Sequence, residues 1–189
     1  MNEHLDQAPS AWVQRWSHLV PAGGTVLDLA CGHGRHMQWF AARGHPVTGV
    51  DRSPEALATA SAWGHVIEAD IENSPWPLLH DGRPRQFDAV VVTNYLWRPL
   101  LPVIAESLAV GGVLLYETFA TGNETVGKPS RPDFLLQTGE LPRAFADLRV
   151  VAYEDGFITT TTRFVQRLAA VREAPSAGTD TGPAQYRLD

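Results

Sequence analysis

The sequence predicts an α/β fold, in which helices cover both faces of a mostly parallel β-sheet. Short β-branched runs alternate along the chain with segments of helical periodicity, an order typical of repeated βαβ units. A glycine-rich turn joins the first run to the next helix, and no internal repeat is present. The length of 189 residues suits one domain. We expect a single domain over residues 1–171 and a disordered polar tail over residues 172–189.

The first part of the chain contains three predicted strands, preceded by an amphipathic helix over residues 11–20. Trp12 and Trp16 recur at helical spacing in this helix, either as core anchors or as part of a lid over a ligand. Ser53-Pro54 marks a later helix start, because serine caps a helix and proline suits its first position. The predicted strands cover residues 25–30, 46–51 and 65–70, and the helices between them begin near residues 35 and 54.

The second part begins with residues 73–85, where prolines and glycine predict a loop. Residues 87–93 are the most β-branched run and predict a central strand. The loop over residues 120–138 exceeds an ordinary connection, which is typical of functional lids. We expect the strand over residues 163–171 to be an antiparallel edge, because its alternation is less regular. The remaining predictions are helices over 99–109 and 139–147, and strands over 113–119 and 148–153.

Composition narrows the class of protein. The net charge of -6 and the absence of a basic run disfavour nucleic acid and anionic membranes as partners. A single cysteine, Cys31, forbids an internal disulfide. The N-terminus lacks a signal-peptide pattern, and no apolar run reaches the ~20 residues of a membrane span. We therefore expect a cytoplasmic monomer or homodimer that acts on a small molecule.

The turn that follows the first strand indicates a nucleotide-like ligand. Gly32 and Gly34 let the backbone approach a ligand closely. Met37 stands where a dinucleotide fingerprint needs a small residue, which disfavours NAD. Asp28 lies within the strand, where it can order the loop and reach toward a cationic amino group.

Two further carboxylates follow the second and third strands. Asp51 is placed to accept hydrogen bonds from both hydroxyls of a ribose. Asp70 is placed to accept a hydrogen bond from an adenine amine, while Ile71 packs on the ring. Together with Asp28, these positions match a ligand that combines adenosine with an amino acid.

These residues resemble the motifs of class I S-adenosylmethionine-dependent methyltransferases. Val26-Leu-Asp-Leu-Ala-Cys-Gly-His-Gly34 is similar to the first motif, Val50-Asp51 to the second and Glu68-Ala-Asp70 to the third; residues 87–95 and 108–114 resemble the fourth strand and a later glycine turn. The resemblance implies a Rossmann-like three-layer sandwich, with a seven-stranded, mostly parallel sheet whose last strand is antiparallel. Residues 127–141 resemble a segment of small bacterial tellurite-resistance-like methyltransferases.

The resemblance implies S-adenosyl-L-methionine as cofactor and S-adenosyl-L-homocysteine as product. The residues expected to hold the cofactor lie at the carboxyl ends of the first four predicted strands. They are Asp28, Ala30, Cys31, Gly32, Gly34, Asp51, Arg52, Asp70, Ile71 and Thr93.

The predicted catalytic residues are Asn94, Tyr95 and Arg131. Asn94 and Tyr95 follow the fourth strand and either line the methyl-transfer site or, with Trp97, only cap the sheet. The two prolines that often accompany base methylation are absent there. Arg131 lies in the long loop and is the first candidate among four basic residues that would attract an anion. The other three are Arg98, Lys128 and Arg143. Glu117 is either a base or a structural partner.

Other chemistries find less support. Cys31, His33 and His36 crowd onto one turn without a fourth ligand, so we expect no metal. Neither a Gly-x-Ser-x-Gly elbow nor a P-loop is present. The predicted function is in-line methyl transfer to a small-molecule acceptor. The alternatives are a cofactor-binding module without turnover and a Rossmann-type NAD-dependent oxidoreductase.

Overall fold

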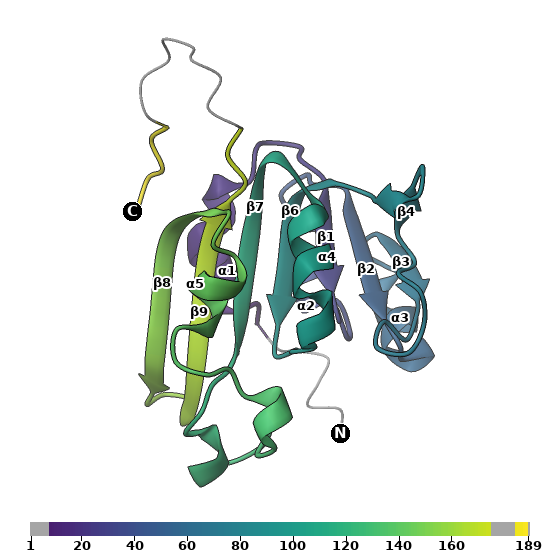
Figure 1. Ribbon diagram of the computed structural model, residues 1–189. Helices are drawn as coiled ribbons and strands as arrows, with labels where there is room; N and C mark the ends of the chain where they lie inside the picture. Colours follow the sequence, from purple (N-terminus) through teal and green to yellow (C-terminus); the bar gives the residue numbers. More distant parts are fainter. Residues whose placement is uncertain (1–7, 175–183, 189) are drawn as a thin grey trace.

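A seven-stranded sheet forms the middle layer of the computed structural model, which describes residues 8–174 and 184–188 (Figure 1). The strand order is β3-β2-β1-β6-β7-β9-β8. β9 pairs antiparallel with both β7 and β8, and the other neighbouring strands of this sheet pair in parallel. The predicted sheet is therefore confirmed. The strands are β1 (Val26–Leu29), β2 (Val47–Asp51), β3 (His65–Glu68), β6 (Phe87–Thr93), β7 (Leu108–Phe119), β8 (Arg149–Ile158) and β9 (Arg163–Val171).

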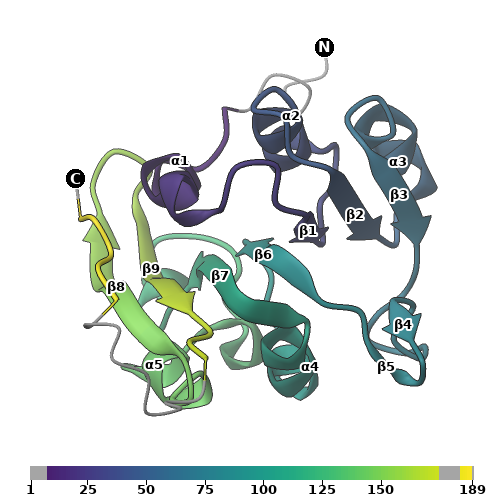
Figure 2. The same ribbon diagram turned by 90° about the horizontal axis from the view of Figure 1, so that it is seen from above.

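Helices cover both faces of the sheet (Figure 2). α1 (Ala11–Trp16), α2 (Arg35–Ala41) and α3 (Pro54–Ala60) lie on one face, and α4 (Leu101–Glu106) and α5 (Glu140–Ala144) lie on the other. The Ser53 hydroxyl accepts a hydrogen bond from the Ala56 N–H and caps α3, as its sequence predicts. Short 3-10 helices complete the connections: η1 (Ser17–Leu19), η2 (Arg98–Leu100), η3 (Asn123–Thr125) and η4 (Pro132–Phe134).

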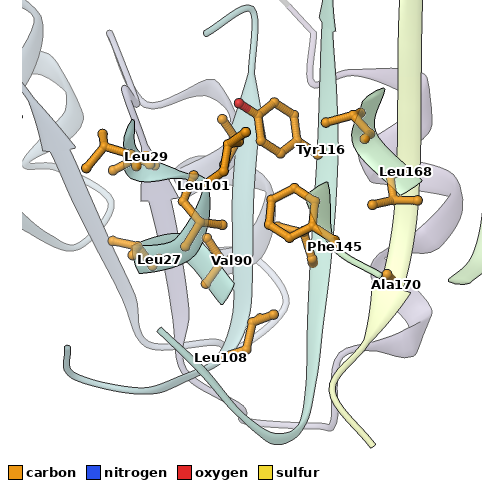
Figure 3. Close-up of a cluster of buried hydrophobic side chains, with 14 of the residues drawn as sticks. Leu27, Leu29, Val90, Leu101, Leu108, Tyr116, Phe145, Leu168 and Ala170 are labelled. Carbon is orange, nitrogen blue, oxygen red and sulfur yellow. The ribbon is translucent and has the colours of Figure 1, made fainter. Parts of the chain in front are cut away.

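Each face of the sheet buries its own apolar cluster. Figure 3 shows the cluster beneath α4 and α5, where Tyr116 and Phe145 meet leucines of β1 and β9. The opposite cluster includes Trp12, Trp16 and Phe40. Both tryptophans are 2% exposed, so α1 is a core element through these side chains.

Met37 packs closely against the sheet despite its size. An added Cβ at Gly49 of β2 would lie 2.8 Å from the Cys31 sulfur and closer still to the Met37 sulfur. The strand therefore supplies the small residue that the helix lacks. Met37 therefore does not hold the helix away from the strand, because Gly49 makes room for it.

Several elements differ from the sequence predictions, among them the helix predicted over residues 11–20, which ends at Trp16 and continues as η1. The predicted loop over residues 73–85 contains a hairpin, β4 (Leu79–His80) with β5 (Arg83–Pro84). β7 begins at Leu108 because an irregularity near Gly111, at φ +81°, carries the chain from α4 into the strand. β8 extends to Ile158 and forms the edge of the sheet. β9 is antiparallel as expected but interior, because β8 pairs along its outer side.

Part of the predicted C-terminal tail contacts the domain. The Tyr186 hydroxyl donates to Glu173 Oε1 at 3.1 Å, and the ring packs against the cluster that contains Trp16. The predicted disorder of residues 175–183 and 189 lies outside the described residues. Within residues 8–174 and 184–188, no helix is long and apolar enough to cross a membrane.

Candidate functional site

The carboxyl ends of the parallel strands surround a cavity of about 380 Å³. Ala30 follows β1, Asp51 ends β2, and Asn94 follows β6. A second hollow of about 230 Å³ adjoins it and shares Ala30, Asn94 and Tyr95. The sheet therefore brings residues from distant parts of the sequence to one edge, as expected for parallel strands.

The glycine loop after β1 is held in place by Asp51. The Gly32 N–H donates to Asp51 Oδ2 at 2.8 Å, and the Ser53 N–H donates to Oδ1 at 2.9 Å. An added Cβ at Gly32 would meet nothing within 4 Å, so open space lies beside this residue. Gly34 instead packs on α3, because its Cβ would lie 2.9 Å from that of Ala60.

Asp28 is almost fully buried beneath the loop, with 1% of its surface exposed. Its Oδ2 atom has no hydrogen-bond partner among the described residues. Burial raises the pKa of Asp28 to about 7, and the nearby Arg35 guanidinium opposes that shift. A buried carboxylate with an unpartnered oxygen is able to receive a cationic group.

The second hollow is lined by loop residues and by Arg35 of α2. Arg35 Nη2 donates to Thr93 Oγ1 at 3.4 Å, and Nη1 donates to the Ala8 carbonyl at 3.5 Å. Sequence reasoning missed Arg35. Its position directly after the glycine motif was the available signal.

Cys31 and His36 serve the packing of the loop. Burial raises the pKa of the Cys31 thiol. His36 accepts a hydrogen bond from the Ser10 N–H at 3.1 Å, and burial lowers its pKa to about 3, so the ring is neutral. Across residues 8–174 and 184–188, no group of three His, Cys, Asp or Glu is arranged to hold a metal ion.

Asp70 caps a turn at the rim of the cavity. Its oxygens accept hydrogen bonds from the Glu72 N–H and from the Asn73 backbone and side chain. These bonds lower its pKa, the Asn73 side-chain bond most strongly. Ile71 and Arg52 line the same cavity. The structure therefore brings together the predicted residues from the ends of β2 and β3.

Asn94 and Tyr95 lie where the two hollows meet. Asn94 has φ +55°, and its N–H donates to the Glu117 carbonyl at 2.9 Å. Burial and the Glu72 carboxylate raise the pKa of Tyr95. The Tyr95 phenol is therefore protonated at neutral pH and is no base.

Arg131 does not line either hollow. It is exposed and pairs with Asp133 at 2.9 Å. Arg98 pairs with Glu140, and Arg143 donates to the Thr138 carbonyl. The expected basic group does not gather at the cavity, because carboxylates and carbonyls beside these arginines hold them elsewhere. The catalytic role of Arg131 remains a prediction.

Of the two roles that the sequence leaves open for Glu117, its burial and its ion pairs support the structural one. Its carboxylate is fully buried and contacts Arg163 at 3.2 Å and Arg167 at 2.6 Å. Sequence reasoning missed both arginines. It also missed Phe119, Pro129 and Phe134, which are apolar residues lining the larger cavity.

This sheet order, with a glycine loop after β1 and acidic residues after β2 and β3, defines the class I methyltransferase fold. Residues 26–112 match the methyltransferase domain family. TehB from Haemophilus influenzae is a structural neighbour with a TM-score of 0.73 and 18% identity; the match covers 90% of this chain and 65% of that one.

Curated relatives are methyltransferases or related enzymes. A ubiquinone biosynthesis O-methyltransferase of Nitrosomonas europaea is 37% identical over 38% of this chain and 32% of its own length. A tRNA U34 carboxymethyltransferase of Shewanella amazonensis is 28% identical over 64% of this chain and 40% of its own length. This chain thus spans less than half the length of these relatives. Its sheet has the fold of the class I S-adenosylmethionine-dependent methyltransferases, and its residues 26–112 carry the match to the methyltransferase domain family.

Proposed function

We propose that this protein transfers a methyl group from S-adenosyl-L-methionine to a small-molecule acceptor. The observation that carries the proposal is the cavity of about 380 Å³, bounded by Ala30, Asp51, Asp70 and Asn94. This cavity lies among the carboxyl ends of four strands, which belong to the segment that matches the methyltransferase domain family. Oxidoreductase chemistry with NAD has no comparable support in the comparisons.

The residues present fit this cofactor. Asp51 would accept hydrogen bonds from the ribose hydroxyls through oxygens that also hold the loop. Asp70 and Ile71 would receive the adenine at the rim. The unpartnered Oδ2 of Asp28 would receive the ammonium group, and Arg35 would face the carboxylate of the amino-acid end. The rest of that end would lie along Ala30, Cys31, Gly32, Gly34, Arg52 and Thr93.

The chain would act mainly by holding the reactants in position. When bound, the cofactor supplies an activated methyl group for in-line displacement by the acceptor. Asn94 and Tyr95 lie where an acceptor would meet that group, and neither is a base at neutral pH. Exclusion of water and near-attack geometry would supply most of the acceleration. This suits a soft or already anionic nucleophile.

The apolar part of the cavity lining favours an acceptor with an apolar body. Phe119, Pro129 and Phe134 line the same cavity as the acidic residues. Apolar walls with few polar groups are typical of small-molecule sites. The curated O-methyltransferases of ubiquinone biosynthesis are consistent with such an acceptor.

We expect a monomer or homodimer, and size-exclusion chromatography with light scattering would measure the oligomeric state.

Calorimetry tests the cofactor half of the proposal. S-adenosylmethionine and S-adenosylhomocysteine should bind in the micromolar range, and Asp51→Ala should weaken both at least about tenfold through lost charged hydrogen bonds. Phe134→Leu is a control that changes an apolar lining residue of the same cavity. Binding of NAD alone would contradict the proposal.

Radiolabelled methyl transfer tests the acceptor half. The candidate methyl acceptors assayed should include catechols, thiols, oxyanions, proteins and tRNA. Transfer to a small molecule supports the proposal, whereas transfer to tRNA alone would place this chain nearer its tRNA-directed relative. Cofactor binding without any transfer would favour the binding module.

A further inference from the structure

The buried Glu117 carboxylate anchors a chain of contacts that leads to the candidate site. Arg163 Nη2 lies 3.2 Å from Oε1, and Arg167 Nε lies 2.6 Å from Oε2. The Ser10 hydroxyl donates to Oε1 at 3.1 Å. A buried carboxylate is costly unless it is paired, so these contacts fix Glu117 and, through it, the Arg163 guanidinium.

Arg163 contacts Asn94 through its other terminal guanidinium nitrogen. Arg163 Nη1 donates to Asn94 Oδ1 at 3.3 Å. A guanidinium has only donors, so the atom it contacts must be the amide oxygen. The amide nitrogen of Asn94 is therefore turned away from Arg163. Asn94 itself lines both hollows, whereas Arg163 lines neither.

The backbone of Asn94 is also held by Glu117. Its φ of +55° is left-handed, a conformation that few residues other than glycine and asparagine adopt. Its N–H donates to the Glu117 carbonyl at 2.9 Å. Glu117 thus supports Asn94 through its own backbone and, by way of Arg163, through the side chain.

We propose that Arg163 is a positioning residue that fixes the Asn94 side chain, so that the amide NH2 group faces the space for the acceptor. The inference rests on the proposed function, because that function supplies the methyl acceptor that the NH2 group would contact. An acceptor with an oxygen lone pair beside its nucleophilic atom suits such a donor. Arg167 cannot replace Arg163, since its other partner is Glu154 at 3.1 Å, not Asn94.

Nuclear magnetic resonance of 15N-labelled protein tests the orientation without turnover. The Asn94 side-chain NH2 signals are those lost in Asn94→Asp. In the wild type they should show restricted motion. In Arg163→Lys and Arg163→Met they should lose this restriction and approach the motion of an asparagine side chain whose Oδ1 accepts no hydrogen bond. Arg167→Lys keeps a cation beside Glu117 and does not remove the contact between Arg163 and Asn94, so it should leave them in place.

Two further measurements separate the possible failures. Arg163→Lys keeps a cation beside Glu117, and its thermal unfolding shows whether the fold persists. Its affinity for S-adenosylhomocysteine should change less than about threefold, whereas absent binding in the wild type would instead refute the proposed function. A freely rotating Asn94 amide in the wild type, or unchanged signals in both Arg163 variants, would overturn the inference.

Discussion

Two non-glycine residues at the site adopt left-handed backbone conformations. Ala30 and Asn94 both have φ +55°, and both line the two hollows. Ala30 follows β1 and Asn94 follows β6, which are neighbouring strands. Unfavourable backbone conformations concentrate at functional sites, where neighbouring contacts enforce them. The two left-handed residues thus lie at the same edge of the sheet as the cavity.

Asp28→Asn should stabilise the cofactor-free protein at alkaline pH. The pKa of Asp28 rises from 3.8 to about 7 on folding because of burial. The free energy of unfolding should therefore fall as pH rises from about 4 to 7 and then level, at a cost on the order of 3–4 kcal/mol. Urea unfolding at pH 4 and pH 8 measures this. Equal stabilities of variant and wild type at both pH values would contradict it.

The affinity for S-adenosylhomocysteine should have the opposite pH dependence. Only the ionised Asp28 can pair with the ligand's ammonium group, so affinity should rise up to about tenfold per unit until pH approaches 7. Above that pH it should level. Calorimetry from pH 5.5 to 8.5 gives the profile, and Asp28→Asn should flatten it. A pH-independent wild type would show that Asp28 takes no part in binding.

The sequence could predict the residues whose position follows from a strand end. Asp51 and Gly32 are such residues, and a hydrogen bond joins them. Glu117, Arg163 and Asn94 could not be grouped in this way, because their contacts join β7, β9 and the segment after β6. Pairing across so much sequence depends on the strand order, which no local pattern contains.

At the scale of elements, Gly34 sets the distance between α2 and α3. Gly34→Ala would place a Cβ 2.9 Å from that of Ala60, at a φ of +82°. Gly44→Ala is the matched control, because Gly44 has φ +84° and open space around it. We expect about 1–2 kcal/mol of destabilisation in the control and about 1–3 kcal/mol more in Gly34→Ala. Denaturant unfolding measures both, and equal losses would refute the packing argument.

The long loop should depend on Arg98. Its guanidinium pairs with both oxygens of Glu140, at 2.7 and 3.0 Å, and donates to the carbonyls of Asp133 and Leu135. Arg98→Met should cost about 1–2 kcal/mol and speed hydrogen exchange across residues 121–138.

Arg131→Met provides the comparison for this loop. The Arg131–Asp133 pair is exposed, so its loss should cost no more than about 0.5 kcal/mol. A loss of methyl transfer in Arg131→Met at unchanged stability would support the catalytic role predicted from the sequence. Unchanged hydrogen exchange in Arg98→Met would show that other contacts hold the loop.

Element boundaries were less predictable than element types. The β-branched run over residues 87–93 predicted β6 with its observed bounds. The start of β7 was missed, because Leu108 pairs with Phe87 before the irregularity at Gly111. β9 was taken for an edge strand, since the sequence does not show that β8 continues to Ile158 and pairs along it.

At the scale of the whole molecule, α1 joins the first residues of the described chain to the last strands of the sheet. The Trp12 indole N–H donates to the Leu168 carbonyl at 3.2 Å, and its ring lies 5.6 Å from that of Trp16. Both rings belong to the cluster that also holds Met37 and Phe40. Because of these contacts, we expect α1 to unfold together with the sheet as one cooperative unit. If α1 were instead a separate lid, the sheet would stay intact when α1 moved away from it.

Trp16→Ala should therefore unfold the whole domain more easily. Removing a fully buried indole costs about 3–5 kcal/mol, which corresponds to a fall in melting temperature of roughly 6–20 °C for a chain of this length. Trp63→Ala is the control, because that side chain is 37% exposed and should cost no more than about 1 kcal/mol. Circular dichroism and tryptophan fluorescence should report one coincident transition in both variants. Two separate transitions in Trp16→Ala, with the second at the wild-type temperature, would instead identify α1 as an independent lid.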